Sequence, residues 1–526
     1  MTYAHFGNLI TDNGREAFLP TVAFDKHYVM YRDIFNLYPP LSYQINGVLY
    51  KIFGENLRVL YFAGLLNTIV IISALYYIAR YFLDRYFAFL IGFFTIFYCV
   101  FGSVSNGIEF IFPYAYAYVY AFSGFLVSLA CFLKYLKDYD YKYLPISLFA
   151  LGFSLANKFE FSLTIFIYIL ALIFLKPKLN ITKILGAIFS FSILPILSYG
   201  YLFYQGLNFQ DVITYIEFGK RFFATQSYKD FASVNSFSFL NSIITFNLKF
   251  LPFWILFLYM LKTKAINKIF FSILSSISIF SYWWFYSQTD VLIFAWLSLP
   301  IFIIILYLIY RLSKNFNKQD FIFLLTIIIF LLSVIKINFL ISKNNYGYYS
   351  IPIFIMLNII FIKNYLKNIS SKINLHLFFT VFLVSVSVIC GYLQSYGNSL
   401  EIKTHKIETP KGIMYADSNI AKPFGEVIDY IKTNTPKDST VLVMQEGVML
   451  NFLTDRPTDL MLYHLINIHI EALGEDYILN RLNQNPPNYV VIIDGRYLTP
   501  KIVDFINKNY KLETRFDKIL IGKNQD

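Results

Sequence analysis

The sequence predicts a polytopic α-helical membrane protein with a C-terminal extracytoplasmic α/β domain, and three observations support this. Hydrophobic residues make up 57% of the 526 residues and charged residues only 14%, whereas soluble domains carry about 25% charged residues. The apolar residues form blocks close to the roughly 20 residues that cross a bilayer. After Tyr396 the character changes to that of a soluble domain with alternating helices and strands.

Twelve apolar segments are predicted as membrane helices, and about thirteen are expected if a first helix precedes this sequence. They are 57–82, 86–104, 113–133, 143–156, 160–175, 181–204, 239–261, 269–286, 291–311, 321–341, 350–366 and 374–395. The chain therefore divides into a first loop with two juxtamembrane helices at 1–56, a transmembrane domain at 57–395 and a C-terminal domain at 396–526.

Basic residues are distributed unevenly over the connections between these segments. One alternate set of connections contains Arg80, Arg85, Lys134, Lys137, Lys142, Lys176, Lys178, Lys183, Lys262, Lys264, Lys268, Arg311, Lys314, Lys318, Lys363, Lys367 and Lys372. The other set contains only Lys158, Lys220, Arg221, Lys229 and Lys343. The positive-inside rule places the first set in the cytoplasm. Residues 1–56, 205–238 and 396–526 are then extracytoplasmic, in a multi-pass protein of the plasma (inner) membrane.

This alternation requires the stretch 143–175 to be two short helices that turn outside at Asn157–Glu160. One long tilted helix would instead bury Lys158 and Glu160 near the bilayer centre, at about 2.5–3.5 kcal/mol per charge on insertion scales. We expect the hairpin. Because the polar first segment also lies outside, we expect a first transmembrane helix to be missing from this sequence.

The net charge of +12 does not indicate a nucleic-acid partner, because the basic residues follow the membrane topology. The three cysteines, Cys99, Cys131 and Cys390, all lie in apolar segments. No disulfide framework is therefore expected in the C-terminal domain.

The first loop contains the run DNGREAFLP from Asp12 and the run YRDIFNLYPPLSYQINGVLYKIFG from Tyr31. Asp12-Asn13-Gly14 suits a tight turn or helix N-cap, with a short helix starting at Arg15. The Pro39-Pro40 pair starts a second helix, Leu41–Phe53, whose apolar residues predict that it lies along the membrane interface.

These two runs, together with LANKFEF at 155–161, resemble the GT-C glycosyltransferases, in particular the branch with protein O-mannosyltransferases and the lipid A aminoarabinose transferase (glycosyltransferase family 39-like). The resemblance covers the whole chain in layout and residues 11–54 and 155–161 in motif. It implies about thirteen membrane helices, an acidic residue in the first outer loop and often a C-terminal extracytoplasmic domain. It also implies a sugar donor on polyprenyl phosphate, inversion at the anomeric carbon and no resident cofactor.

Carried over by the resemblance, the catalytic acidic residue is Asp12, which would take the acceptor proton; a plain helix N-cap is the alternative. Many relatives have Asp-Glu where this chain has Asp12-Asn13, so a supporting acid would be Glu16 or Asp33. The donor phosphate needs cations at the outer surface, and the candidates are Arg15, Lys158, Lys336 and Lys343. The alternatives are a structural pair with Asp12 or Asp33 for Arg15, pairing with Glu160 or snorkelling to the surface for Lys158, and snorkelling for Lys336.

Asn106, Glu109 and Glu160 are candidates to line the substrate site, although a solvated loop explains the first two and pairing with Lys158 explains the third. Tyr346, Tyr348, Tyr349, Trp283 and Trp284 are explained by interfacial aromatic belts, with a lipid groove as the alternative. The loop 205–238 carries an amphipathic stretch that could cover the donor, select the acceptor or lie on the surface without a role. No metal-ligand spacing is present apart from His464 and His469, and a divalent ion held by carboxylates stays open.

In the C-terminal domain we predict helices at 424–433, 477–482 and 502–508, and strands at 440–444, 489–493 and 518–521, in a partly parallel sheet. No Gly-rich phosphate loop is present, so a nucleotide donor is not expected. The predicted function is that of an inverting hexosyl- or pentosyltransferase acting on a polyprenyl-phosphate sugar, with a lipid, glycan or protein acceptor. A transporter or lipid flippase, which would show internal repeats and broken helices, and a polysaccharide ligase or polymerase are the alternatives.

Overall fold

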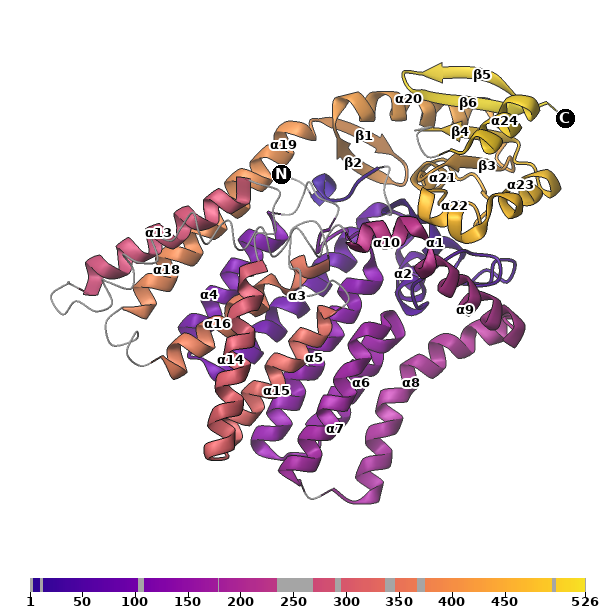
Figure 1. The fold of residues 1–526 in the computed structure, drawn as a ribbon. Helices are drawn as coiled ribbons and strands as arrows, with labels where there is room; N and C mark the ends of the chain where they lie inside the picture. Colours follow the sequence, from indigo (N-terminus) through magenta and orange to yellow (C-terminus); the bar gives the residue numbers. More distant parts are fainter. Residues whose placement is uncertain are drawn as a thin grey trace.

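A computed structural model of the chain describes residues 3–9, 13–102, 108–177, 179–233, 268–288, 295–335, 346–366, 374–493 and 498–525. Within these ranges the molecule has a long helical bundle with a smaller α/β domain at one end (Figure 1). The N-terminal residues lie beside the start of that domain rather than at the far end of the bundle (Figure 1).

Eleven of the twelve predicted membrane segments are helices, and 239–261 lies outside the described residues. The bundle consists of α3 (Leu57–Phe82), α4 (Arg85–Phe94), η2 (Thr95–Val100), α5 (Tyr116–Asp138), α6 (Tyr143–Asn157), η3 (Phe159–Leu163), α7 (Thr164–Leu175), α8 (Ile181–Gln205), α13 (Lys268–Gln288), α14 (Ala295–Lys314), α15 (Lys318–Ser333), η5 (Tyr346–Ser350), α16 (Ile351–Tyr365), α18 (Leu375–Ser385) and η6 (Val386–Tyr396). Five described helical stretches are long and apolar enough to cross a bilayer. The predicted polytopic helical fold is confirmed.

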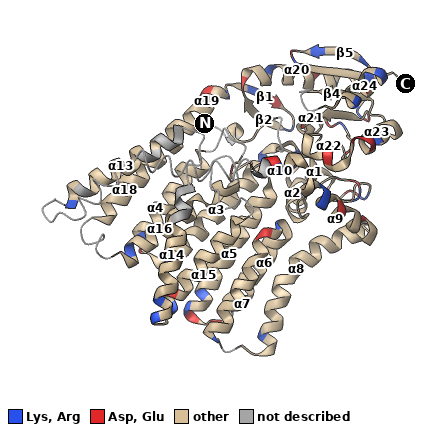
Figure 2. Ribbon diagram, in the orientation of Figure 1, with Lys and Arg blue, Asp and Glu red and all other residues tan. Residues whose placement is uncertain are grey.

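The basic connections gather at the end of the bundle opposite the C-terminal domain (Figure 2). Lys363 at the end of α16 pairs with Asp84 before α4. Lys318 at the start of α15 lies 4.2 Å from the ring of Tyr139, which follows α5. These contacts bring together connections that contain the first set of basic residues, at one end of the bundle, as the sequence predicted.

The chain turns back at Lys158, which confirms the predicted hairpin. Helix α6 stops at Asn157, and Lys158 has extended backbone angles (φ −159°, ψ 122°) before η3 and α7 begin. The hydroxyl of Tyr141, before α6, donates a 2.7 Å hydrogen bond to the carbonyl of Lys183 in the first turn of α8. The connections on either side of α6–α7 therefore lie at the same end of the bundle, and Lys158 lies toward the other.

Small residues let three of the helices approach each other closely. A Cβ added to Gly152 of α6 would lie 2.0 Å from the carbonyl oxygen of Phe191 in α8, and one added to Gly124 of α5 would lie 2.8 Å from that of Ala150 in α6. Close backbone contact at small residues is a common means of association for helices in lipid. Substitution at either glycine would separate the helices that carry Lys158.

Four shorter helices lie at the end of the bundle that faces the C-terminal domain: α1 (Asn13–Val22), α2 (Leu41–Phe53), α9 (Phe209–Ala224) and α10 (Gln226–Ser233). The bounds of α2 coincide with those predicted, since the Pro-Pro pair ends the preceding loop. Its side chains Ile52 and Phe53 are 65% and 63% exposed. That pattern suits a helix at the membrane interface, which stays a prediction.

The C-terminal domain has a two-stranded antiparallel sheet and a four-stranded mixed sheet with the order β3-β4-β6-β5. Its elements are α19 (Gly397–Ile402), β1 (His405–Thr409), β2 (Gly412–Ala416), α20 (Ser418–Asn434), β3 (Val441–Met444), α21 (Val448–Thr454), α22 (Asn467–Leu473), α23 (Glu475–Gln484), β4 (Tyr489–Ile492), α24 (Pro500–Asn509), β5 (Tyr510–Phe516) and β6 (Ile519–Asn524). Strands β3 and β4 pair in parallel and β4 and β6 antiparallel. The partly parallel sheet is confirmed, whereas β1, β2, β5, α19, α21 and α22 were not predicted.

The C-terminal domain is docked on the first loop by backbone contacts. The amide of Phe35 donates to the carbonyl of Leu460 (3.0 Å), and the amide of Leu57 donates to that of Lys411 (2.8 Å). At Gly14 of α1, an added Cβ would lie 2.5 Å from the backbone nitrogen of Met449 in α21. The helix that follows Asp12 is therefore covered directly by the C-terminal domain.

Candidate active site

The DNGRE motif fixes α1 to the segment that leads into α5. The side-chain amide of Asn13 donates to the carbonyls of Phe112 (3.0 Å) and Pro113 (2.8 Å). Two residues further along α1, the guanidinium of Arg15 donates to the carbonyl of Tyr114 (3.0 Å), the residue after Pro113. Asn13, Arg15 and Glu16 are all buried, at 0%, 5% and 0% exposure. The sequence predicted a tight turn or helix N-cap at this polar motif, and the structure shows that its side chains Asn13, Arg15 and Glu16 are buried.

Glu16 completes this series and is the central carboxylate of the site. It accepts hydrogen bonds from the backbone amide of Tyr116 (3.0 Å) and the hydroxyl of Tyr43 (3.1 Å). It also pairs with Arg15 at 3.0 Å. Burial raises the pKa of Glu16, and the charge of Arg15 and these hydrogen bonds oppose that rise.

Lys158 reaches the same place from the α6–η3 turn. Its Nζ lies 4.7 Å from the ring centroid of Tyr38, and the guanidinium carbon of Arg15 lies 4.9 Å from the same centroid. Lys158 is only 5% exposed, and its distance to the carboxylate of Glu160 is 3.8 Å. Two cations that are 143 positions apart in the sequence therefore contact one aromatic ring, which interacts favourably with both.

Tyrosines enclose the two cations. The hydroxyls of Tyr38 and Tyr346 lie 2.6 Å apart, and the ring of Tyr346 stacks on Tyr118 with centroids 4.7 Å apart. Lys158 also lies 4.8 Å from the Tyr346 centroid, and Arg15 lies 5.6 Å from that of Tyr114. We refer to Arg15, Glu16, Lys158, Glu160 and these four tyrosines (Tyr38, Tyr114, Tyr118 and Tyr346) as the Tyr38 cluster.

Four predicted site residues meet in this cluster: Arg15, Glu16, Lys158 and Glu160. Asp12, Asn106, Lys336 and Lys343 lie outside the described residues, so their assignments stay predictions. Lys158 was expected at an outward turn, and the structure adds that it is buried. The predicted alternative of pairing between Lys158 and Glu160 is present only as a 3.8 Å contact.

Asp33, predicted as a supporting acid, is engaged by a neighbour at the surface. Its carboxylate pairs with Arg32 at 2.7 Å, where the two side chains are 35% and 31% exposed. It also accepts the amide of Val29 at 2.8 Å. Arg32 in turn donates to the carbonyl of Gly206, which follows α8. Asp33 thus holds the first loop to the α8–α9 connection, and Glu16 is the acid beside Arg15.

Glu109 does not lie on a solvated turn, as the sequence suggested. It is fully buried and accepts the amide of Gly7 at 2.7 Å. Lys403, which follows α19, donates to the carbonyls of His5 (2.9 Å) and Gly7 (2.8 Å). Burial raises the pKa of Glu109 to about 8, against the opposing charge of Lys403. Its described contacts join the N-terminal residues to the start of the C-terminal domain.

Tyr348 and Tyr349 do not form an interfacial belt, and for these two residues that interpretation was wrong. Tyr348 and Tyr349 are 1% and 0% exposed, and their hydroxyls donate to the carbonyls of Tyr98 (2.8 Å) and Glu109 (2.9 Å). Sequence analysis also missed Tyr38. The available signal was its position directly before the Pro-Pro pair, because a residue there is held in place by the rigid turn that follows.

Helix α9 covers one side of this region. Phe218 packs edge-on against Phe35 of the first loop, with centroids 4.8 Å apart. Phe222 lies 5.3 Å from His469 of the C-terminal domain. The amphipathic stretch of the loop 205–238 therefore joins the first loop to the C-terminal domain instead of lying on the surface without partners.

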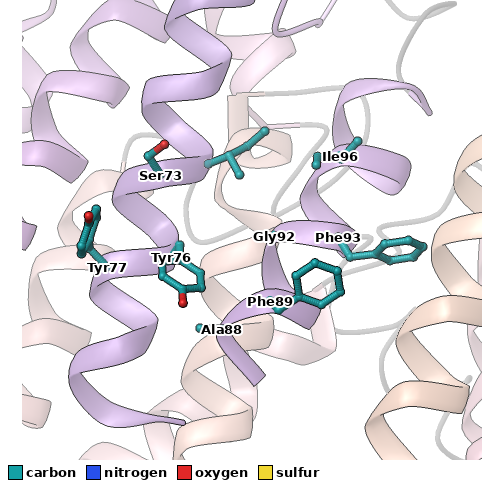
Figure 3. A pocket seen from close by; sticks show the side chains of 9 residues that line it. Ser73, Tyr76, Tyr77, Ala88, Phe89, Gly92, Phe93 and Ile96 are labelled. Atoms are coloured by element: carbon teal, nitrogen blue, oxygen red, sulfur yellow. The ribbon is translucent and has the colours of Figure 1, made fainter. Parts of the chain in front are cut away.

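A groove between α3 and α4 is separate from this site. It is lined by side chains that include Tyr76, Tyr77, Phe89 and Phe93 (Figure 3). None of the residues lining it belongs to the Tyr38 cluster. Over the described ranges of the chain, no group of three or more His, Cys, Asp or Glu side chains is arranged to hold a metal ion.

The Tyr38 cluster can stabilise an anion. Arg15 offers a planar fork of donors and Lys158 a compact ammonium, and both lie where water is largely excluded. Charged donors in such a place stabilise charge that develops on a leaving oxygen far more strongly than in water. The nearby carboxylates balance the two cations when no anion is bound.

A scan against protein-family profiles and a search of curated proteins gave no match. A search of solved structures gave matches along most of the chain. An oligosaccharyltransferase of Archaeoglobus fulgidus, tethered with an acceptor peptide, matches with 13% identity and a TM-score of 0.44 over 92% of this chain and 65% of its own. ArnT from Cupriavidus metallidurans, bound to undecaprenyl phosphate, matches with 10% identity and a TM-score of 0.48 over 99% of this chain and 94% of its own.

Both are GT-C glycosyltransferases, the class that the motif at 11–54 resembles. This chain spans 65% of the length of that oligosaccharyltransferase, slightly less than two thirds. At these identities and TM-scores the likeness concerns overall layout, and it transfers no residue role and no substrate to this chain.

Proposed function

We propose that this protein is an inverting glycosyltransferase that moves a sugar from a polyprenyl-phosphate-linked donor to a hydroxyl- or amide-bearing acceptor at the outer face of the membrane. The observation that carries the proposal is the convergence of Arg15 and Lys158 on Tyr38. Both cations are buried, and buried charged donors stabilise an anion far more strongly than exposed ones do. A lipid-linked phosphate at the membrane surface is such an anion.

In this proposal the donor phosphate is held between Arg15 and Lys158. The bond between the anomeric carbon and the phosphate oxygen breaks, and the electron pair stays on that oxygen. The two cations stabilise the resulting phosphate charge. Among the described residues, Lys158 pairs with Glu160 at 3.8 Å and Arg15 pairs with Glu16 at 3.0 Å.

The acceptor oxygen or nitrogen attacks the opposite face of the anomeric carbon and gives its proton to Asp12. Asp12 directly precedes Asn13, whose side chain is tied to the Phe112 and Pro113 carbonyls. The resemblance of the motif at 11–54 assigns this role to Asp12, and general base catalysis requires such a group within reach of the proton. Glu16 keeps Arg15 oriented rather than taking the proton itself.

The proposed location is the plasma (inner) membrane, with the Tyr38 cluster and the C-terminal domain outside. Support comes from the basic connections, which lie at the opposite end of the bundle (Figure 2). The acceptor is a lipid, a glycan or a protein. The C-terminal domain covers α1, so it is placed to limit which acceptors reach Asp12.

The test is transfer of radiolabelled sugar from polyprenyl-phosphate donors by the purified protein and by three variants. Asp12→Asn should reduce kcat by at least a hundredfold, because it removes the base. Lys158→Met should mainly raise KM for the donor. Lys142→Met, an exposed lysine at the basic end, is the matched control and should behave as wild type.

Full activity of a folded Asp12→Asn protein would overturn the assignment of the base. If the wild type consumes no polyprenyl donor and instead moves lipid across a vesicle bilayer, the protein is a flippase and the proposal fails.

A further inference from the structure

A pair of histidines lies between the C-terminal domain and the first loop. His464 and His469, of which the second belongs to α22, have ring centroids 4.0 Å apart and are each only 5% exposed. Histidine pairs are seldom buried without a role, because each ring carries a polar nitrogen on either side and titrates near neutral pH. The proposed transfer reaction does not use either of them.

His464 is held in place by Glu446. The two residues form an isolated antiparallel bridge between the end of β3 and the segment before α22, and Nε2 of His464 contacts the carboxylate of Glu446. A carboxylate bound to one ring nitrogen fixes the orientation of the imidazole. His469 therefore packs against an imidazole ring whose orientation is fixed.

His469 faces the first loop. Its ring meets Phe35 edge-on, with centroids 4.9 Å apart and planes at 88°, and Phe222 of α9 lies on another side at 5.3 Å. Its Nδ1 is buried with no hydrogen-bond partner among the described residues.

We propose that neutral His469 is a positioning residue that holds α22 against the first loop and α9, and that the C-terminal domain controls donor binding through this contact. His469 packs between Phe35 of the first loop, which also carries Arg15, and Phe222 of α9. A protonated His469 would place a charge among these rings and His464, in a region closed to water. The cost of burying that charge would loosen α22 from the first loop. This inference rests on the proposed function, since it assumes that Arg15 binds the donor phosphate.

The surroundings of His469 decide the direction of the pH effect. Arg15 of α1 and His464 of the C-terminal domain act on His469, and Glu446 contacts His464. Two more charged groups lie on the neighbouring helices. Glu471 of α22 accepts a hydrogen bond from the amide of Ser227 in α10, and Arg221 of α9 lies over the ring of Phe218. Burial, His464 and Arg15 together lower the pKa of His469. The neutral form is therefore favoured when the domain is docked, and the docked state weakens as the pH falls below about 6.5, the ordinary value for histidine.

The experiment is the pH dependence of sugar transfer, with kcat and the KM for the polyprenyl-phosphate donor measured between about pH 5 and 8. In the wild type the KM should rise on the acid side, by up to about tenfold per pH unit for one proton. His469→Asn and His469→Gln stay neutral throughout, so the rise in KM should be absent or much smaller. His405→Asn changes an exposed histidine of β1 and should keep the wild-type profile.

A second measurement does not depend on activity. In the wild type, protease resistance of the α19–β1 connection should fall between about pH 6.5 and 5, and the His469 variants should show less of this loss. If KM and protease resistance change with falling pH in the same way in the wild type and in both His469 variants, the inference is wrong. A wild type that shows the protease effect but transfers no sugar would overturn the proposed function and leave the docking role of His469 standing.

Discussion

Glu16 is the residue whose contacts hold the Tyr38 cluster together. It joins Arg15 of its own helix, Tyr43 of α2 and the first amide of α5. A buried carboxylate is stable only where hydrogen bonds and a cation compensate the loss of water. Glu16 has both, so its removal would leave Arg15 as a buried charge without its closest described counter-ion.

We therefore expect Glu16→Ala to destabilise the protein by about 3–5 kcal/mol, the usual effect of removing one partner from a buried ion pair. The thermal unfolding midpoint in detergent measures this. Asp138→Ala removes an exposed pair with Lys134 on α5 and is the control, with an unchanged midpoint. Equal effects of the two substitutions would show that Glu16 does not hold the cluster.

Glu109 gives a second prediction for a single residue, which concerns how the stability of the protein depends on pH. Its pKa is raised to about 8, so the folded protein binds a proton that the unfolded chain has released near its ordinary value of about 4.3. The stability that Glu109 contributes is full below pH 4 and is lost as the pH rises through 8. The Glu109→Gln variant should lack this loss. Unfolding midpoints of both proteins between pH 5 and 9 test it, and parallel curves would contradict it.

At the scale of elements, α1 is packed between the segment before α5 and helix α21 of the C-terminal domain. Its tight contact with α21 is at Gly14, where a Cβ would lie 2.5 Å from the Met449 nitrogen. A backbone atom cannot move aside as a flexible side chain can. The position of Arg15 and Glu16, one and two residues further on, therefore depends on the absence of a side chain at Gly14.

Gly14→Ala is expected to destabilise the docked state by about 1–3 kcal/mol, the typical cost of overpacking, and to reduce sugar transfer. Gly425→Ala in α20 is the matched control, because a Cβ there meets nothing within 4 Å. Alanine in an open helical position should stabilise by up to about 1 kcal/mol. Thermal midpoints and transfer rates of the two variants provide the comparison, and a lower midpoint for Gly425→Ala alone would refute this account.

At the scale of the whole molecule, the two ends of the bundle differ in charge and in what covers them. One end carries basic connections, and the other carries the C-terminal domain over α1 (Figure 2). This polarity is what a protein with a fixed orientation in the membrane requires. In the proposed function, it also separates Arg15 and Lys158, which we assign to the donor phosphate, from the basic connections.

The orientation can be measured by cysteine labelling after Cys99, Cys131 and Cys390 are replaced by serine. An impermeant maleimide should label Asn419→Cys, an exposed position of α20, in intact cells. It should label Lys142→Cys only after the membrane is permeabilised. The reverse pattern would place the Tyr38 cluster in the cytoplasm and would contradict the proposed outer-face reaction.

Much of the fold follows from local sequence. Apolar blocks of about 20 residues have few stable alternatives to a membrane helix, because every backbone polar group in lipid must be paired within the segment. The Pro39-Pro40 pair fixed the start of α2, and the cost of a buried Lys158–Glu160 pair predicted the break after Asn157. The strands β3, β4 and β6 were recognisable as short apolar runs bounded by polar residues.

The short and more polar elements were not predictable in the same way. Strands β1 and β5 are largely exposed, so they lack the apolar alternation that identifies a strand. The seven-residue helices α21 and α22 are too short for a clear helical period. Their structure depends on packing against the rest of the domain and against α1 and α9.

Hydropathy and charge act locally along the chain, so the sequence was enough to predict the class of the protein, the hairpin at Lys158 and the polar motif of the first loop. Which polar residues meet depends on tertiary packing. Packing brings Lys158 to Tyr38 beside Arg15 and buries Glu109 beside Gly7. Glu109 and Gly7 are 102 positions apart, and the geometry of such pairs depends on how whole helices pack, which no local pattern specifies.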